Sequence, residues 1–167
     1  MRQAGLALAL VFAATGPVMA ACPAGTQTVL SCSAKGGTKV LDICLDLPNA
    51  TISYAYGAPN RQPELAMRRP IAAIDHTPWP GIGRSIWEST VFHNQGYAYE
   101  VFISVDRMAD NSQPIGGVVL HKGSQQVAKV DCDAGTAEIG LWAVSDAKQA
   151  LGQCWDQGRQ NWNICTQ

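Results

Sequence analysis

Three histidines are the first residues to test for metal binding or acid–base chemistry: His76, His93 and His121. Their spacing matches no local ligand motif, and a zinc site needs three or four converging ligands with groups that orient them. His93 and His121 each end a predicted strand and could meet in space. We nevertheless expect scattered histidines, with no metal and no cofactor.

Ser85 is a candidate nucleophile, because it follows a glycine-rich turn and His76, preceded by Asp75, lies nine residues earlier. The neighbouring residues do not form the G-x-S-x-G motif. Ser85 opens a predicted strand instead of the sharp strand-to-helix turn that exposes a nucleophile. The pattern favours Asp75 and His76 as the cap of a turn. A small envelope hydrolase that uses Ser85 or His76 is therefore an alternative function.

Four glutamates could supply the paired carboxyl groups of a glycosidase: Glu64, Glu88, Glu100 and Glu138. Such a pair must face across a cleft. Alternation along their strands instead predicts that Glu88 and Glu100 point to solvent, opposite the aromatic face. We expect surface ion pairs with Arg84 or Arg107, which contribute little to stability.

The segment 75–88 combines residues that are typical of binding surfaces. Prolines and glycines fix a loop that carries Trp79, and Arg84, Ser85 and Trp87 follow directly. Tryptophan buries a large area with few rotamers, and arginine offers a planar fork of donors. We take these four residues as the candidate binding site. The alternative is that Trp79 and Trp87 close one end of the fold as part of the core.

The six cysteines favour structural disulfides over metal or redox chemistry: Cys22, Cys32, Cys44, Cys132, Cys154 and Cys165. No pair has the CxxC spacing of a thioredoxin centre or a zinc ribbon. An even count in an exported chain predicts three disulfides in an oxidising compartment. Six cysteines allow fifteen pairings, among which we expect Cys132 with Cys154.

The first twenty residues have the pattern of a secretory signal peptide, with one arginine, a short apolar run and a small-residue ending at Ala20. Cleavage there would leave 21–167 as a single domain. The sequence around Cys22 also resembles a lipobox, in which that cysteine would carry a lipid anchor. Lipidation of Cys22 would leave five cysteines, one of them without a disulfide partner. The even number of cysteines therefore favours the unlipidated form and a periplasmic or secreted protein.

Charge excludes two classes of protein. The chain has 12 basic and 13 acidic residues, a net charge of -1, and only 15% charged residues. A polybasic nucleic-acid binder and a self-repelling disordered chain are both inconsistent with that balance. No apolar run approaches the roughly 20 residues that a transmembrane helix needs. We expect recognition through shape and a few aromatic and arginine contacts.

Alternating apolar and polar residues predict the elements that must position these side chains. A strand is expected at 50–56. Three hairpins are expected, each around a turn that contains glycine: 26–32 with 38–44, 86–93 with 97–106, and 117–121 with 126–132. Proline-rich segments at 57–60 and 78–83 interrupt the strands.

One stretch, 145–155, predicts a helix with Ala147, Ala150, Leu151 and Cys154 on one face and Ser145 as its cap. A disulfide at Cys154 would fix this helix across the sheet. The fold class that follows is mainly β, an antiparallel small barrel or sandwich of about eight strands with a short C-terminal helix.

The late hairpin resembles that of the bacterial periplasmic lysozyme inhibitors. The residues that carry the resemblance are Gly117-Val118-Val119-Leu120-His121-Lys122-Gly123 followed by Gln126-Val127-Ala128-Lys129-Val130-Asp131-Cys132. The resemblance implies a small disulfide-closed β-barrel that inhibits a lysozyme by plugging its cleft with a loop. The family's Ser-Gly-x-x-Tyr loop is absent, its nearest substitute being Gly83-Arg84-Ser85, so no inhibitory residue is carried over.

The function that these features favour is an exported binding or inhibitory module. Its partner would be a protein or glycan of the cell envelope, engaged by the loop that ends at Trp87. A structural envelope protein is a further alternative.

Overall fold

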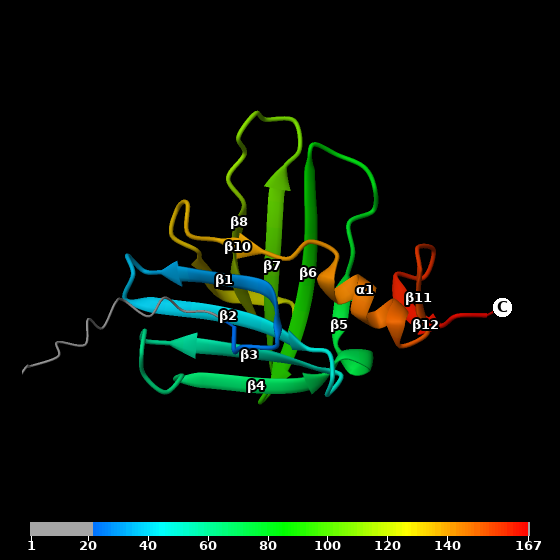
Figure 1. Cartoon of the computed structure of the whole chain (residues 1–167), viewed down its shortest axis with the longest axis horizontal. Coiled ribbons are helices and arrows are strands. Elements are labelled where there is room, and N and C mark those ends of the chain that lie inside the picture. The colour runs from blue at the N-terminus through cyan, green and yellow to red at the C-terminus, as the bar shows by residue number, and fades with distance from the viewer. Residues whose placement is uncertain (1–21, 167) are drawn as a thin grey trace, which may run out of the picture.

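The computed structural model describes residues 22–166 and shows a sandwich of two five-stranded antiparallel sheets (Figure 1). The predicted mainly β fold is confirmed as a sandwich, because the two sheets are separate and do not close into a barrel. The predicted signal peptide lies outside the described residues. No helix within the described part of the chain is long and apolar enough to span a bilayer.

The first sheet has the strand order β10-β1-β2-β3-β4. Its strands are β1 (Gln27–Ala34), β2 (Lys39–Asp46), β3 (Thr51–Gly57), β4 (Leu65–Pro70) and the two-residue β10 (Glu138–Ile139). The predicted hairpin of β1 and β2 and the predicted strand β3 are present, whereas β4 and β10 were not predicted. A short 3-10 helix, η1 (Ile71–Ala73), leads from β4 to the second sheet.

The second sheet has the order β5-β6-β7-β8-β9. Its strands are β5 (Asp75–Thr77), β6 (Ser85–Asn94), β7 (Tyr97–Asp106), β8 (Ile115–Lys122) and β9 (Gln125–Asp131). Both predicted hairpins are confirmed here. Gln95 and Gly96 connect β6 to β7 with positive φ angles of 48° and 78°, as a tight hairpin turn requires.

The strands of the two sheets cross steeply, so β6, β7 and β8 extend beyond the edge of the first sheet (Figure 1). A ten-residue strand is about 33 Å long, whereas five neighbouring strands cover only about 19 Å from first to last. One end of the second sheet must therefore project from the sandwich. That projecting end carries the loops 78–84 and 107–114.

The core lies between the sheets and consists of alternate residues from both inner faces. Its fully buried members include Leu30, Leu41, Ile43, Ile52, Phe92 and Val101. Gly116 allows the sheets to approach closely, because a Cβ atom there would meet Leu30 Cδ1 at 2.7 Å. The burial of large aliphatic and aromatic side chains is the main source of stability for such a sandwich.

All six cysteines form disulfides, in the pairs Cys22–Cys44, Cys32–Cys132 and Cys154–Cys165. The predicted count of three is confirmed, but the predicted pair Cys132–Cys154 is wrong. Cys132 directly follows β9 and lies beside β1, where Ala34 forms an isolated bridge with it. Cys22, the residue that a lipid anchor would use, has its sulfur bonded to Cys44, so the lipobox alternative is incompatible with this structure.

The helix α1 (Ala143–Ala150) is shorter and begins earlier than predicted. Trp142 precedes it with a left-handed φ of 69°, and Ser145, the predicted cap, lies inside the helix. Cys154 is not helical but belongs to a small hairpin of β11 (Gln153–Asp156) and β12 (Asn161–Ile164). The Cys154–Cys165 disulfide therefore closes this hairpin and does not fix the helix across the sheet.

Candidate functional site

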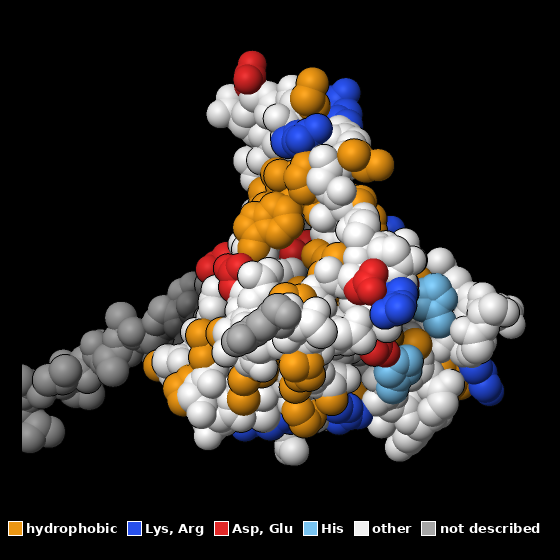
Figure 2. Space-filling model, turned by 90° about the vertical axis from the view of Figure 1, so that its right-hand side faces the viewer, with side chains coloured by type: hydrophobic (Ala, Val, Ile, Leu, Met, Phe, Trp, Pro, Cys, Tyr) orange, Lys and Arg blue, Asp and Glu red, His pale blue; other side chains and the backbone are white. Residues whose placement is uncertain are grey.

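The projecting end of the second sheet forms a narrow knob, which we call the tip: loops 78–84 and 107–114 with the adjoining Trp87 and Ile115. Figure 2 shows hydrophobic and arginine or lysine side chains gathered on this knob, which stands out from the broad body. The exposed fractions are 72% for Ile82, 69% for Met108, 59% for Ile115 and 39% for Trp87. Large apolar side chains are thus concentrated where the molecule protrudes furthest.

Asp106 organises the turn at the end of β7. Its carboxylate accepts hydrogen bonds from the Met108 backbone N–H at 2.9 Å and from Arg84 Nε at 2.6 Å, and its own N–H donates to Ser112 Oγ at 3.1 Å. The Met108 hydrogen bond, followed by the Arg84 contact, lowers the pKa of the Asp106 carboxyl. These contacts tie both loops of the tip to one side chain.

Trp79 anchors the other loop to the body. Its Nε1–H donates to the Ile82 carbonyl at 2.8 Å, its ring lies 6.1 Å from that of Trp142, and the Arg107 guanidinium lies 5.0 Å from its centroid. Trp79 is half-buried and Trp87 is exposed, so neither is a core residue. A cation–π contact and a hydrogen bond hold the loop without covering Ile82 or Met108.

The four residues predicted to form the binding site, Trp79, Arg84, Ser85 and Trp87, lie on or beside the tip. They differ in their exposure and in their contacts. Arg84 pairs with Asp106, and Ser85 is half-buried opposite Asp106 in the β6–β7 ladder. Trp79 supports the loop, while Trp87 projects from β6. Sequence reasoning missed the exposed Met108 and Ile115. Met108 lies in the distant 107–114 loop and Ile115 begins β8, and only the pairing of β7 with β6 and β8 brings them to the same end.

A second group of polar side chains lies further along β6 and is buried. Glu88, which was predicted to face solvent, is only 2% exposed; its Oε2 accepts the Trp142 backbone N–H at 2.8 Å. Its Oε1 lies 3.4 Å from Ser145 Oγ and 3.6 Å from His76 Nε2. That prediction was wrong because α1 covers this face of the sheet.

His76 completes this buried network. Its Nδ1 lies 3.0 Å from Thr90 Oγ1, and its Nε2 lies 3.0 Å from Ser145 Oγ. Every group is satisfied if Thr90 donates to Nδ1, Nε2–H donates to Ser145, and the Ser145 hydroxyl donates to Glu88. The prediction that Asp75 and His76 cap a turn is wrong, since both belong to β5.

The Ser145–His76–Glu88 group lacks the geometry of a catalytic triad. In a triad the carboxylate holds the histidine nitrogen opposite the nucleophile, whereas here Thr90 occupies that nitrogen and Glu88 lies on the serine side. All three residues are buried. Ser85 lies five residues from Thr90 along β6, a distance of about 16 Å, so it is out of hydrogen-bond reach of His76.

The other two histidines pair separately with carboxylates. His93 Nε2 contacts Asp75 Oδ2 at 2.8 Å, and His121 Nε2 contacts Glu100 Oε2 at 3.1 Å. They flank Ala98 from opposite sides in the ladder and do not meet. The expected pairing of Glu100 with an arginine is therefore wrong. Within residues 22–166 no three His, Cys, Asp or Glu side chains converge as metal ligands would.

Lys148 attaches α1 to the C-terminal hairpin. It is 1% exposed, its Nζ donates to the Ala72 carbonyl at 3.4 Å and to Gln153 Oε1 at 3.3 Å, and it lies 5.5 Å from the Trp162 ring centroid. Burial lowers the pKa of its ammonium group. Trp162 Nε1–H in turn donates to the His76 carbonyl at 2.8 Å, so the hairpin and the buried network support each other.

Comparison with models of known protein families, with curated proteins and with solved structures finds no match for this chain. The likeness of the late hairpin to lysozyme inhibitors therefore stands on the residues that carry it.

Proposed function

We propose that the protein is an exported binding or inhibitory module whose tip inserts into a concave surface of a partner in the cell envelope. The observation that carries this proposal is the exposure of Ile82, Met108 and Ile115 on a narrow projection. Contiguous exposed apolar side chains on a folded domain mark interaction sites, because leaving them in water is unfavourable. A convex knob matches a cleft better than a flat surface.

The construction of the tip suits such a role. Asp106, Arg84 and the Trp79–Arg107 contact hold both loops, so little conformational entropy is lost when they bind. Arginine and tryptophan at the margin of the apolar residues resemble the composition of binding hot spots. A lysozyme-like hydrolase, with its long substrate cleft, is a partner of suitable shape.

Three disulfides suit an oxidising compartment, so we place the protein in the periplasm or outside the cell. The alternative of a small hydrolase has less support. Ser85 is distant from His76, and the serine that does contact His76 is buried in a satisfied network. No single feature favours a purely structural role.

The test is to assay lysozymes of several types with the purified mature protein at micromolar concentration, and to capture partners from envelope extract. We expect inhibition or a captured partner that is lost in Ile82→Asp and in the double variant Trp79→Ala, Arg84→Ala. Val127→Asp is the matched control, because Val127 is an exposed apolar residue on β9, remote from the tip. Full lysozyme activity together with an unchanged set of captured proteins would refute the proposal.

A further inference from the structure

A pocket enters the sandwich between its two sheets, on the side where side chains of the edge strands β4 and β9 line one opening. Because the sheets are separate, no strand ladder closes this side of the sandwich. The volume of the pocket is about 150 Å³, the size of an apolar cavity that holds one benzene molecule. Tyr99, which lines it, lies about 23 Å along β7 from Asp106, so the pocket is remote from the tip.

The lining of this pocket is apolar and rich in aromatic rings. Tyr54 and Val118 are buried, with exposed fractions of 2% and 5%, and lie deepest in it. Tyr56, Leu65 and Tyr99 are half-buried and lead outward. The rings of Tyr54 and Tyr99 already meet edge to face, with their centroids 5.8 Å apart. A ligand ring can extend this arrangement, because aromatic rings favour tilted and edge-to-face contacts.

The only charged residue that lines the pocket, Lys129, directs its charge elsewhere. Alternation along β9 places Val130 on the core side and Lys129 on the outer face of the sheet. On that outer face Lys129 Nζ contacts Asp131 Oδ1 at 2.7 Å and lies 5.1 Å from the ring centroid of Phe102. A charged ligand inside the pocket would therefore lack a counter-charge and lose its hydration, which is costly.

Water is also a poor occupant of this pocket. A water molecule held in a protein interior needs two to four polar partners, and the lining here is almost wholly hydrocarbon. An apolar ligand instead gains from the contact, because it removes its own surface and that of the pocket from water together. The lining thus favours an uncharged apolar molecule over water and over ions.

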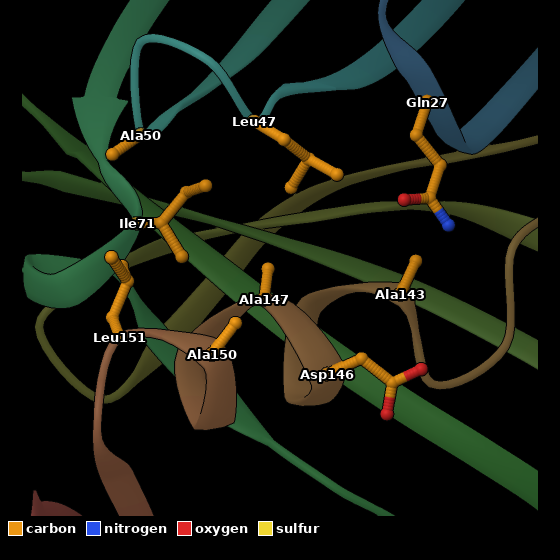
Figure 3. A pocket seen from close by; sticks show the side chains of 9 residues that line it. All are labelled: Gln27, Leu47, Ala50, Ile71, Ala143, Asp146, Ala147, Ala150 and Leu151. Carbon is orange, nitrogen blue, oxygen red and sulfur yellow. The ribbon is translucent and has the colours of Figure 1, made fainter.

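A second hollow, between α1 and the turn that connects β2 to β3, provides a contrast (Figure 3). It is larger, about 300 Å³, but no aromatic residue lines it. Leu47 and Leu151 border it and are 50% and 42% exposed, so it is a groove on the surface. Ala150 of α1 also faces this groove (Figure 3) and offers a position for a control variant.

We propose that the pocket between the sheets binds an uncharged molecule that contains one aromatic ring. The ring lies against Tyr54 and Tyr99, and its outer edge reaches Leu65 at the opening. The volume of the pocket admits one ring and excludes two fused rings. The site does not depend on the proposed function of the tip.

The probes are toluene and its charged analogues benzoate and benzylammonium, titrated into the disulfide-bonded protein and followed by NMR and calorimetry. We expect toluene to bind at least about tenfold more tightly than either analogue, because neither charge finds a partner in the pocket. The amide shifts should be confined to the strands that line the pocket, β3, β4, β7, β8 and β9. Naphthalene, which has two fused rings, should not bind to the native protein.

Three variants, each checked for folding by circular dichroism, test the location and size of the site. Ala128→Phe fills the opening from an exposed position on β9 and should abolish toluene binding. Ala150→Phe makes the same replacement in the groove of Figure 3 and should leave toluene binding unchanged. Leu65→Ala enlarges the pocket and should allow naphthalene to bind.

Three results would overturn the proposal. The first is the absence of toluene binding up to its solubility in water, and the second is binding of benzoate or benzylammonium as tight as that of toluene. The third is toluene binding that survives in folded Ala128→Phe. If Ala128→Phe does not fold, Leu65→Ala takes its place, and failure of this variant to bind naphthalene counts against the site.

Discussion

The middle and the start of β6 reverse the usual distribution of polar and apolar residues. Glu88, Ser89 and Thr90 are buried in the middle of the strand. Trp87, near the start of the strand, and Ile82, in the loop before it, are exposed on the tip. Buried polar groups normally cost free energy unless they are hydrogen-bonded, and a concentration of large exposed apolar side chains marks a candidate interaction surface. The same strand therefore contributes to the buried scaffold at its middle and to the exposed tip, the proposed contact surface, at its start.

Trp142 connects these two regions. Its backbone N–H is held by Glu88 in the buried network, and its ring packs on Trp79 at the base of the tip. Its left-handed φ is unfavourable for a residue with a side chain and is maintained by these contacts on both sides. The buried network thus stabilises the position from which the tip projects.

The largest loss of unfolding free energy should come from removing a disulfide of the scaffold, Cys32–Cys132. This disulfide links residues 100 positions apart and joins β1 to the end of β9. The double variant to alanine should lose about 4–5 kcal/mol of unfolding free energy, because a loop of that length gains much entropy when opened. Removing Cys154–Cys165, with a separation of 11, should cost about 3 kcal/mol or less. Urea unfolding of each variant measures this difference, and equal losses would contradict it.

Among the buried polar residues of β6, Glu88 should be the one whose replacement by alanine is most destabilising. This replacement removes the acceptor of the Trp142 N–H and of the Ser145 hydroxyl in a partly to fully buried site, a loss of about 3 kcal/mol. Glu88→Gln keeps the size and one acceptor and should lose less. Denaturant unfolding followed by tryptophan fluorescence gives both values. A loss below about 1 kcal/mol in Glu88→Ala would show that the network is not structural.

Substitutions at the tip should leave the unfolding free energy almost unchanged but reduce partner binding. Ile82→Ser and Met108→Ser should each change the unfolding free energy by no more than about 0.5 kcal/mol, because both side chains are already largely exposed. The same variants should lose partner binding. If either one destabilises the fold as much as Glu88→Ala, the exposed residues of the tip have a structural role and the contrast along β6 fails.

The smallest effect should be a local change of the tip at acidic pH. The pKa of Asp106 is lowered below 3.8 in the folded protein, so its hydrogen bonds favour folding above that pH and are lost as the pH falls through the lower value. The NMR signals of the Met108 amide and Arg84 Nε should then shift, and Asp106→Asn should abolish this titration. A Met108 amide signal that titrates identically in the native protein and in Asp106→Asn would exclude Asp106 as the organiser of the turn.

The three long hairpins could be predicted because their signals are local. Alternation along 97–106 and the short turn at Gln95 and Gly96 determine the longest hairpin without reference to the rest of the chain. The burial of Glu88 could not be predicted, since alternation defines two faces of a strand but does not say which face a helix 54 residues later will cover.

The disulfides and the complete tip depend on contacts between distant segments. Cys132 and Cys154 are close in sequence, but the sandwich places Cys132 beside β1 and closes Cys154 into a local hairpin. Trp79, Arg84 and Trp87 could be selected from residue type alone. Met108 and Ile115 have no comparable local signal, and only the register between β7 and its neighbours brings them to the same end.

Site-specific photo-crosslinking tests the role of the tip most directly. A photoreactive residue is placed at Ile82 or, as the control, at Val127, which is also exposed but lies on β9, and each protein is irradiated with cell-envelope extract. We predict one discrete covalent adduct from position 82, competed by unlabelled native protein and not by Met108→Asp, and none from position 127. Adducts of equal yield at both positions, or competition by Met108→Asp as strong as by the native protein, would contradict the assignment of the tip as the binding surface.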